Sequence, residues 1–117
     1  VQHDSFAQEP SWFTTSPIMS IKNALSKASL NISDVDLFEI NEAFAVVPMV
    51  AMKELGLSHE KVNPYGGAVS LGHPIGASGA RILVTLLNGL HQKQLRFGVA
   101  SICIGGGEAS TMIIERM

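Results

Sequence analysis

The 117-residue sequence has little of several features that define common protein classes. Its single cysteine, Cys103, rules out a disulfide within the chain and leaves a free thiol, which suits a reducing compartment. No apolar run reaches the roughly 18 residues that a membrane span needs. Only 15% of the residues are charged, the net charge is −2 and there is no basic run, so an extended nucleic-acid surface is not expected.

The composition is otherwise that of one packed domain. Hydrophobic residues make up 46% of the chain, which is enough for a core, and the length suits a single domain. The first residue is Val1 rather than methionine, so we expect a fragment in which any leader sequence would be invisible. The last residues lack a peroxisomal Ser-Lys-Leu ending, which leaves the cytoplasm or the mitochondrion as the expected location.

The spacing of apolar residues predicts helices that alternate with short strands. The expected elements are helices over 17–29, 42–55 and 76–92 and strands over 37–40, 96–104 and 109–114. The two last strands are joined by glycines, which favours an antiparallel hairpin. The helix over 42–55 is apolar on almost every side, a pattern that indicates deep burial. Together these elements predict an α/β fold, a sheet covered by helices.

The stretch over 66–81 is the centre of the chain's chemistry. Its five glycines surround His73 and are followed by an apolar helical run. Pro74 biases His73 away from the helical region, so the stretch predicts a tight loop that aims an imidazole, the side chain best suited to proton transfer near neutral pH. A Gly-rich turn with a merely exposed histidine is the alternative, and this stretch alone favours neither. The phosphate-binding glycine patterns do not occur here.

Two further clusters bear on that choice. Cys103 ends an apolar run just before three glycines, whose backbone N–H groups are candidates to stabilise a thiolate. A buried structural cysteine is the commoner situation, and the glycines favour the functional interpretation. Asn41 stands where the strand over 37–40 meets the next helix, where an asparagine is otherwise an ordinary N-cap. The other histidines have no metal-ligand spacing, so no metal site is expected.

The three clusters, Asn-Glu-Ala-Phe at 41–44, the Gly-rich stretch at 66–81 and Cys-Ile-Gly-Gly-Gly at 103–107, resemble the C-terminal catalytic half of the thiolase family. Within that family the sequence is most similar to the acetyl-CoA C-acetyltransferases, and the resemblance runs over nearly the whole chain. It implies a layered αβα fold whose mixed sheet has five strands. It also implies an acyltransferase that reversibly condenses two acetyl-CoA to acetoacetyl-CoA, with coenzyme A thioesters as substrates and no cofactor.

The resemblance also assigns catalytic roles. His73 would activate the nucleophilic cysteine of the N-terminal half and donate its Nε2–H to a thioester oxygen. Asn41 would orient a water into the same oxyanion hole. Cys103 would be the base that removes the α-proton of the second acetyl-CoA, and the Gly105 N–H would serve a second oxyanion hole. Ala43 and Phe44 match positions that line the pantetheine tunnel, although as bare sequence both are core residues.

Two expectations concern what the chain lacks. Residues 1–7 are too few and too polar to supply the strand that precedes this segment in thiolases, so the domain over 1–117 is expected to be truncated at its N-terminus. The N-terminal half would be the main partner, and a homodimer or homotetramer is expected at full length. The isolated chain is expected to be inactive. The alternative is a truncated, non-catalytic thiolase-like module with a binding role or no independent role.

Overall fold

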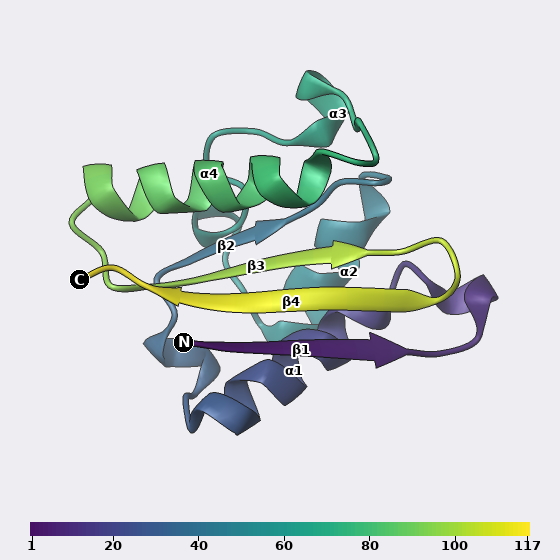
Figure 1. Ribbon diagram of the computed structural model, residues 1–117, viewed down its shortest axis with the longest axis horizontal. Helices are drawn as coiled ribbons and strands as arrows, with labels where there is room; N and C mark the ends of the chain where they lie inside the picture. Colours follow the sequence, from purple (N-terminus) through teal and green to yellow (C-terminus); the bar gives the residue numbers. More distant parts are fainter.

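A mixed four-stranded sheet runs through the centre of the molecule (Figure 1). In the computed structural model, which describes residues 1–117, the strands lie in the spatial order β1-β4-β3-β2. They are β1 (Gln2–Ala7), β2 (Leu37–Ile40), β3 (Phe97–Cys103) and β4 (Glu108–Glu115). β4 pairs antiparallel with β1 and β3, whereas β2 and β3 are parallel. The predicted strands at 37–40, 96–104 and 109–114 and the predicted hairpin are thus confirmed, with small shifts at their ends.

Helices cover both faces of this sheet, which makes the fold a layered αβα sandwich. Figure 1 shows α4 (Ser78–Gln92) on one side and α1 (Ser16–Ala28) on the other. α2 (Val46–Leu55) packs beside α1, and the short helix α3 (Ala68–Leu71) precedes α4. Three single turns of 3-10 helix, at Pro10–Trp12, Ile32–Asp34 and His59–Lys61, complete the elements. The α/β class predicted from the sequence is confirmed.

Each face of the sheet has its own core because successive strand residues point to opposite sides. On the α4 side, Leu37 and Ala100 pack against three buried helix residues, Ile82, Leu86 and Leu90. Phe38 and Ile40 point the other way, into the larger core shared with α1 and α2. α4 approaches β3 closely, since a Cβ added to Gly98 would lie 2.7 Å from Cδ1 of Leu86.

The N-terminal residues form a strand, so the prediction of a truncated sheet is wrong at this edge. β1 pairs with β4 from Gln2 opposite Ile113 to Ala7 opposite Glu108. An edge strand can remain polar on one face, because only its other face packs against the core. The polar residues of 1–7 did not prevent a strand, because the buried Asp4 carboxylate lies 2.6 Å from the Lys27 ammonium group on α1.

At the opposite edge of the sheet the structure has fewer strands than the resemblance implied. The sheet has four strands instead of five. Beyond β2, the brief extended piece around Val62 makes a single parallel bridge to Phe38. It is held there because Asn63 N donates to Phe38 O at 2.9 Å, while its side chain bonds both backbone groups of Ile40.

Two helix predictions also need correction. The helix expected over 42–55 begins only at Val46, and Asn41 does not cap it. The deep burial expected of that helix is wrong in part: Val47 and Ala51 are buried, but Met49 is 61% exposed and Phe44, in the loop before it, is equally exposed. The helix expected over 76–92 is α4, which begins two residues later, and the separate helix α3 was not predicted.

Candidate active site

Asn41 and Cys103 lie at the edge of the sheet where the parallel strands β2 and β3 end, and His73 contacts Asn41 there. Asn41 directly follows β2, and its backbone N donates to Ser101 O at 2.9 Å. Cys103 is the last residue of β3, two positions after Ser101. The carboxyl ends of neighbouring parallel strands share one edge of a sheet, which is where ligands bind in open α/β folds. β2 and β3 thus bring residues from distant motifs to one place.

The loop before α4 carries His73, whose Nδ1 is fixed at the start of that helix. Gly72 turns the chain with a φ of +92°, and His73 Nδ1 lies 2.5 Å from the hydroxyl of the buried Ser78, the first residue of α4. The Ser78 hydroxyl also lies 3.2 Å from Pro74 O, which can only accept a hydrogen bond. We therefore assign Ser78 as the donor to Pro74 O and the acceptor from His73, which places the ring proton on Nδ1 and a lone pair on Nε2.

Asn41 completes the arrangement from the end of β2. Its Nδ2 lies 3.3 Å from His73 Nε2, and the residue is fully buried. An amide NH2 donates, so this contact agrees with a lone pair on Nε2. The sequence predicted both residues separately, and the structure brings them into contact. The alternative that Asn41 is an ordinary helix N-cap is wrong, since the helix begins further on and its N-terminus has no side-chain cap.

Behind Asn41 lies a buried ion pair that the sequence analysis missed. Arg81 of α4 donates from Nη2 to Asn41 Oδ1 at 3.4 Å, and its Nη1 lies 3.5 Å from Glu39 Oε2. Glu39 is 2% exposed. Burial raises the pKa of Glu39 to about 7, a rise that Arg81 opposes and the nearby Glu42 carboxylate increases. The signal in the sequence was a carboxylate inside the apolar strand over 37–40.

Cys103 is a free, buried thiol in the larger core. Burial raises the pKa of the Cys103 thiol, and its own backbone N–H opposes that rise more weakly. The sequence offered the amides of the following glycines as candidate donors to the thiolate. Within this chain no glycine N–H is bonded to the sulfur, and desolvation is the larger influence on the pKa of Cys103. A reactive thiolate at Cys103 therefore requires a positive potential from groups outside these residues.

The glycine turn after Cys103 presents an unused backbone donor. Ile104 N donates to Glu108 O at 2.8 Å and Gly107 N donates to Ile104 O at 3.1 Å, which closes the turn. The exposed Gly105 has an N–H that bonds to no group of the chain, and a Cβ added there would meet nothing within 4 Å. Gly107 differs, because its φ is +99° and an added Cβ would collide with Gln8 O.

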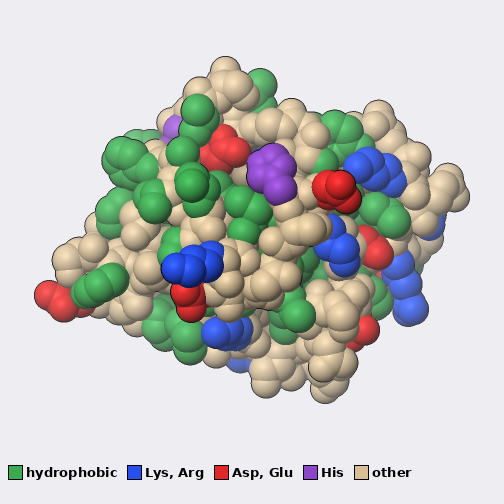
Figure 2. Space-filling model, turned by 180° about the vertical axis from the view of Figure 1, so that it is seen from behind, with side chains coloured by type: hydrophobic (Ala, Val, Ile, Leu, Met, Phe, Trp, Pro, Cys, Tyr) green, Lys and Arg blue, Asp and Glu red, His purple; other side chains and the backbone are tan.

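Ala43 and Phe44 lie in the irregular loop between β2 and α2. Ala43 packs against the larger core, whereas the Phe44 ring is mostly exposed and meets only Phe13 edge-on, with ring centroids 6.1 Å apart. The prediction that both are plain core residues thus holds for Ala43 alone. Figure 2 shows hydrophobic side chains gathered at the end of the molecule where α3 lies; there Val69 and Leu71 are 68% and 64% exposed.

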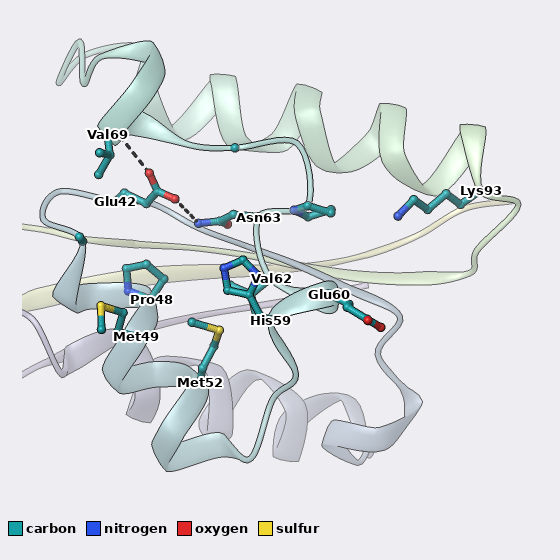
Figure 3. A pocket seen from close by; sticks show the side chains of 13 residues that line it. Glu42, Pro48, Met49, Met52, His59, Glu60, Val62, Asn63, Val69 and Lys93 are labelled. Carbon is teal, nitrogen blue, oxygen red and sulfur yellow. Dashed lines mark hydrogen bonds between the residues drawn. The ribbon is translucent and has the colours of Figure 1, made fainter.

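An open groove of about 1020 Å³ lies beside this loop (Figure 3). Neither Asn41, His73, Cys103 nor Gly105 lines it. Glu42 lines the groove, and its carboxylate accepts from Asn63 Nδ2 at 3.0 Å and from Val69 N at 2.9 Å, the two bonds drawn in Figure 3.

No group of three or more His, Cys, Asp or Glu side chains is placed to hold a metal ion. None of the helices has the length and apolar character that crossing a membrane would require. The polar groups that the chain places near the strand ends include an imidazole, an amide, a thiol and a backbone N–H with no partner in the chain.

Comparison with known proteins assigns this arrangement to a family. The thiolase C-terminal domain family matches residues 1–116. The chain is 57% identical over 111 residues to acetyl-CoA acetyltransferase 1 of Arabidopsis thaliana, covering 95% of this chain and 27% of that protein. It is 56% identical over 108 residues to the cytosolic acetyl-CoA acetyltransferase of Rattus norvegicus, covering 92% of this chain and 27% of that protein.

Solved structures agree. The Bacillus anthracis acetyl-CoA acetyltransferase superimposes with a TM-score of 0.97 at 42% identity. The Acat5 thiolase from Ascaris suum, solved in complex with coenzyme A, gives a TM-score of 0.93 at 45% identity. Each alignment covers 100% of this chain and 30% of the other. The chain belongs to the thiolase family, and it spans little more than a quarter of the length of the curated relatives it matches.

Proposed function

We propose that this chain is the C-terminal part of an acetyl-CoA acetyltransferase, which reversibly condenses two acetyl-CoA to acetoacetyl-CoA by a Claisen reaction. The observation that carries the proposal is the Asn41–His73 contact of 3.3 Å at the sheet edge where Cys103 ends β3. The names of the relatives support the choice of acetyl-CoA, and the reaction needs no metal or other cofactor. The N-terminal part of the same enzyme supplies the nucleophilic cysteine.

His73 acts first as a base and then as a donor. The Nε2 lone pair takes the proton of the nucleophilic cysteine, whose sulfur then attacks the first acetyl-CoA. The imidazolium that results carries an Nε2–H, which donates to the thioester oxygen as negative charge develops there. The proton then passes to the departing CoA thiolate. Asn41 orients a water toward the same oxygen from its position beside the ring.

Cys103 acts as the base in the step that forms the C–C bond. Its thiolate removes a methyl proton from the second acetyl-CoA, and the resulting carbanion attacks the acyl carbonyl on the nucleophilic cysteine. A C–C bond forms, the C–S bond to the enzyme breaks, and the released thiolate takes back the proton held by Cys103. The free Gly105 N–H donates to the second thioester oxygen. The raised pKa of Cys103 suits the return of a proton during cleavage.

Binding of the substrate uses the loop next to the site. Ala43 and Phe44 line the path of the pantetheine arm, and the exposure of the Phe44 ring leaves it free to contact that arm. The remaining wall comes from the N-terminal part. The enzyme works as a homodimer or homotetramer in the cytoplasm or the mitochondrion.

The test is product formation by the full-length protein that contains these residues. Incubation with acetyl-CoA is expected to release CoA and acetoacetyl-CoA in equal amounts, and acetoacetyl-CoA with CoA is expected to react in reverse. His73→Ala is expected to lose both reactions, whereas His91→Ala, at the exposed end of α4, is expected to keep them. Release of CoA without acetoacetyl-CoA would indicate a hydrolase and overturn the proposal.

A further inference from the structure

We propose that Arg81, seated on the buried Glu39 carboxylate, is a positioning residue that holds the Asn41 amide with its NH2 group toward His73. This inference rests on the proposed function, because it concerns the residue that activates the nucleophile. Arg81 and Glu39 do not contact the reacting atoms in this proposal. They act through Asn41, which lies between Arg81 and the imidazole.

The hydrogen-bond partners of an amide set its orientation, and for Asn41 the partner that sets it is Arg81. A guanidinium has donors only, so Arg81 Nη2 requires the Asn41 oxygen on its side at 3.4 Å. If the amide were reversed, its NH2 would face a donor and its oxygen would face the imidazole. With the amide held by Arg81, the NH2 group lies 3.3 Å from His73 Nε2 and needs a lone pair there.

Glu39 fixes the guanidinium in turn. Arg81 Nη1 and Glu39 Oε2 are 3.5 Å apart, and both are buried atoms with no hydrogen-bond partner, so the two charges compensate each other. Charges buried in this way are costly unless paired. The pair lies on the α4 face of the sheet and directs the other guanidinium nitrogen at Asn41. An ion pair that served the core alone would not require that second contact.

The consequence for His73 is a defined proton position. Ser78 accepts from Nδ1 and Asn41 donates to Nε2, so both partners favour the neutral ring with its lone pair at Nε2. Without Arg81 the amide is free to turn its oxygen to the ring, which favours an Nε2–H and weakens the base. Arg81 from α4 is the charged group that contacts Asn41, and it is paired with Glu39 from β2, on which Glu42 from the loop after β2 also acts.

The first test measures acylation of the nucleophilic cysteine in the full-length enzyme with labelled acetyl-CoA. Arg81→Met is expected to slow acylation about 10- to 100-fold, in line with the cost of a misplaced catalytic group. The KM for acetyl-CoA is expected to stay unchanged. Glu39→Gln is expected to show a smaller loss of the same kind.

Two further variants separate positioning from folding. Arg81→Lys keeps the charge but not the two-nitrogen fork, so it is expected to fold and still lose part of the acylation rate. Arg96→Met is the matched control, because Arg96 is an exposed arginine paired with Glu115 at 2.7 Å, and it is expected to change nothing. Losses of acylation that follow the melting temperature from one variant to the next would overturn the proposal and make the pair structural.

A second readout does not depend on activity. Ring-¹⁵N histidine labelling and solid-state NMR of the full-length enzyme report which ring nitrogen carries the proton, and His73→Ala identifies the signal. The parent is expected to show a bare Nε2, and Arg81→Met a protonated one. A proton on Nε2 in the parent would overturn the positioning proposal even if acylation occurs. A parent that gives this NMR result but forms no acyl-enzyme would instead refute the proposed function.

Discussion

Asn41 and His73 are 32 positions apart in the sequence, yet their side chains lie 3.3 Å apart. Asn41 is fixed by the end of β2, and His73 by Ser78 at the start of α4. The contact therefore follows from packing α4 against β2, and it forms without any other chain. Ile75, two residues after His73, is 86% exposed, so the surface around this contact is open. The Asn41–His73 contact is thus formed, but the surface around it is still exposed, and this leads to the first prediction.

The isolated 117-residue chain is expected to have no thiolase activity. It contains one cysteine, whereas the proposed reaction uses a nucleophilic cysteine and a separate base. A CoA-release assay with acetoacetyl-CoA and CoA measures this directly, and the expected rate equals that of buffer. Turnover well above buffer by the isolated chain would show that Cys103 alone suffices and that the two-cysteine scheme is wrong.

Gly105→Val in the full-length enzyme is expected to reduce activity far more than stability. A Cβ at this position meets nothing within 4 Å, so folding is little affected, but the added bulk displaces the N–H from the second thioester oxygen. Loss of one such donor typically costs about 10²- to 10³-fold in rate. The measurement pairs kcat with the melting temperature.

Gly107→Ala is the contrasting variant in the same turn. Its positive φ and the collision of a Cβ with Gln8 O predict a loss of stability first, with activity falling in step. If Gly105→Val also lost stability and activity in equal proportion, the Gly105 N–H would have no catalytic role.

The sequence predicted most of the fold and the main site residues for identifiable reasons. The apolar spacing of α1 and α4 and the glycines between β3 and β4 are local signals, and they gave the elements correctly. β1 was missed because residues 1–7 looked too few and too polar for a strand. The ion pair that makes burial of Asp4 possible could not be seen, since its partner Lys27 lies on another element. The exposure of Met49 was missed because an apolar pattern does not show which surface covers it.

The contacts that Ser78 and Arg81 make around His73 also could not be predicted from the local sequence. Ser78 and Arg81 lie inside the glycine-rich stretch that singled out His73, but their roles depend on where α4 packs. The glycines after Cys103 were candidates to stabilise its thiolate, whereas burial, a property of the whole fold, raises the pKa of the Cys103 thiol. Proximity in sequence identified the motifs, and only tertiary packing decided how their side chains interact.

Glu39 is expected to make the stability of the chain fall as pH rises from about 4.5 to about 7. Its pKa is about 7 in the folded chain and its ordinary value is 4.5, so the folded state holds the proton over that interval while the unfolded state releases it. The free energy of unfolding therefore decreases from about pH 4.5 to about pH 7, by about 3 kcal/mol in total. Urea unfolding of the 117-residue chain at about pH 5 and pH 8 measures the decrease.

Glu39→Gln supplies the control for that slope. Glutamine has no proton to lose, so the variant is expected to have a flatter dependence on pH between about pH 5 and about pH 8. Glu60→Gln, at an exposed carboxylate in the turn before Val62, is expected to keep the parent's dependence. An unchanged slope in Glu39→Gln would mean that another group causes it.

Cys103→Ser and His73→Ala are expected to stop the full-length enzyme at different steps. A serine hydroxyl gives no accessible anion near neutral pH, so Cys103→Ser is expected to trap label from acetyl-CoA on the nucleophile yet lose hydrogen–deuterium exchange at the acetyl methyl. His73→Ala lacks the base that activates the nucleophile, so it is expected to trap no label. Exchange in Cys103→Ser at the parent rate would remove Cys103 from the reaction and leave it as a buried thiol of the core.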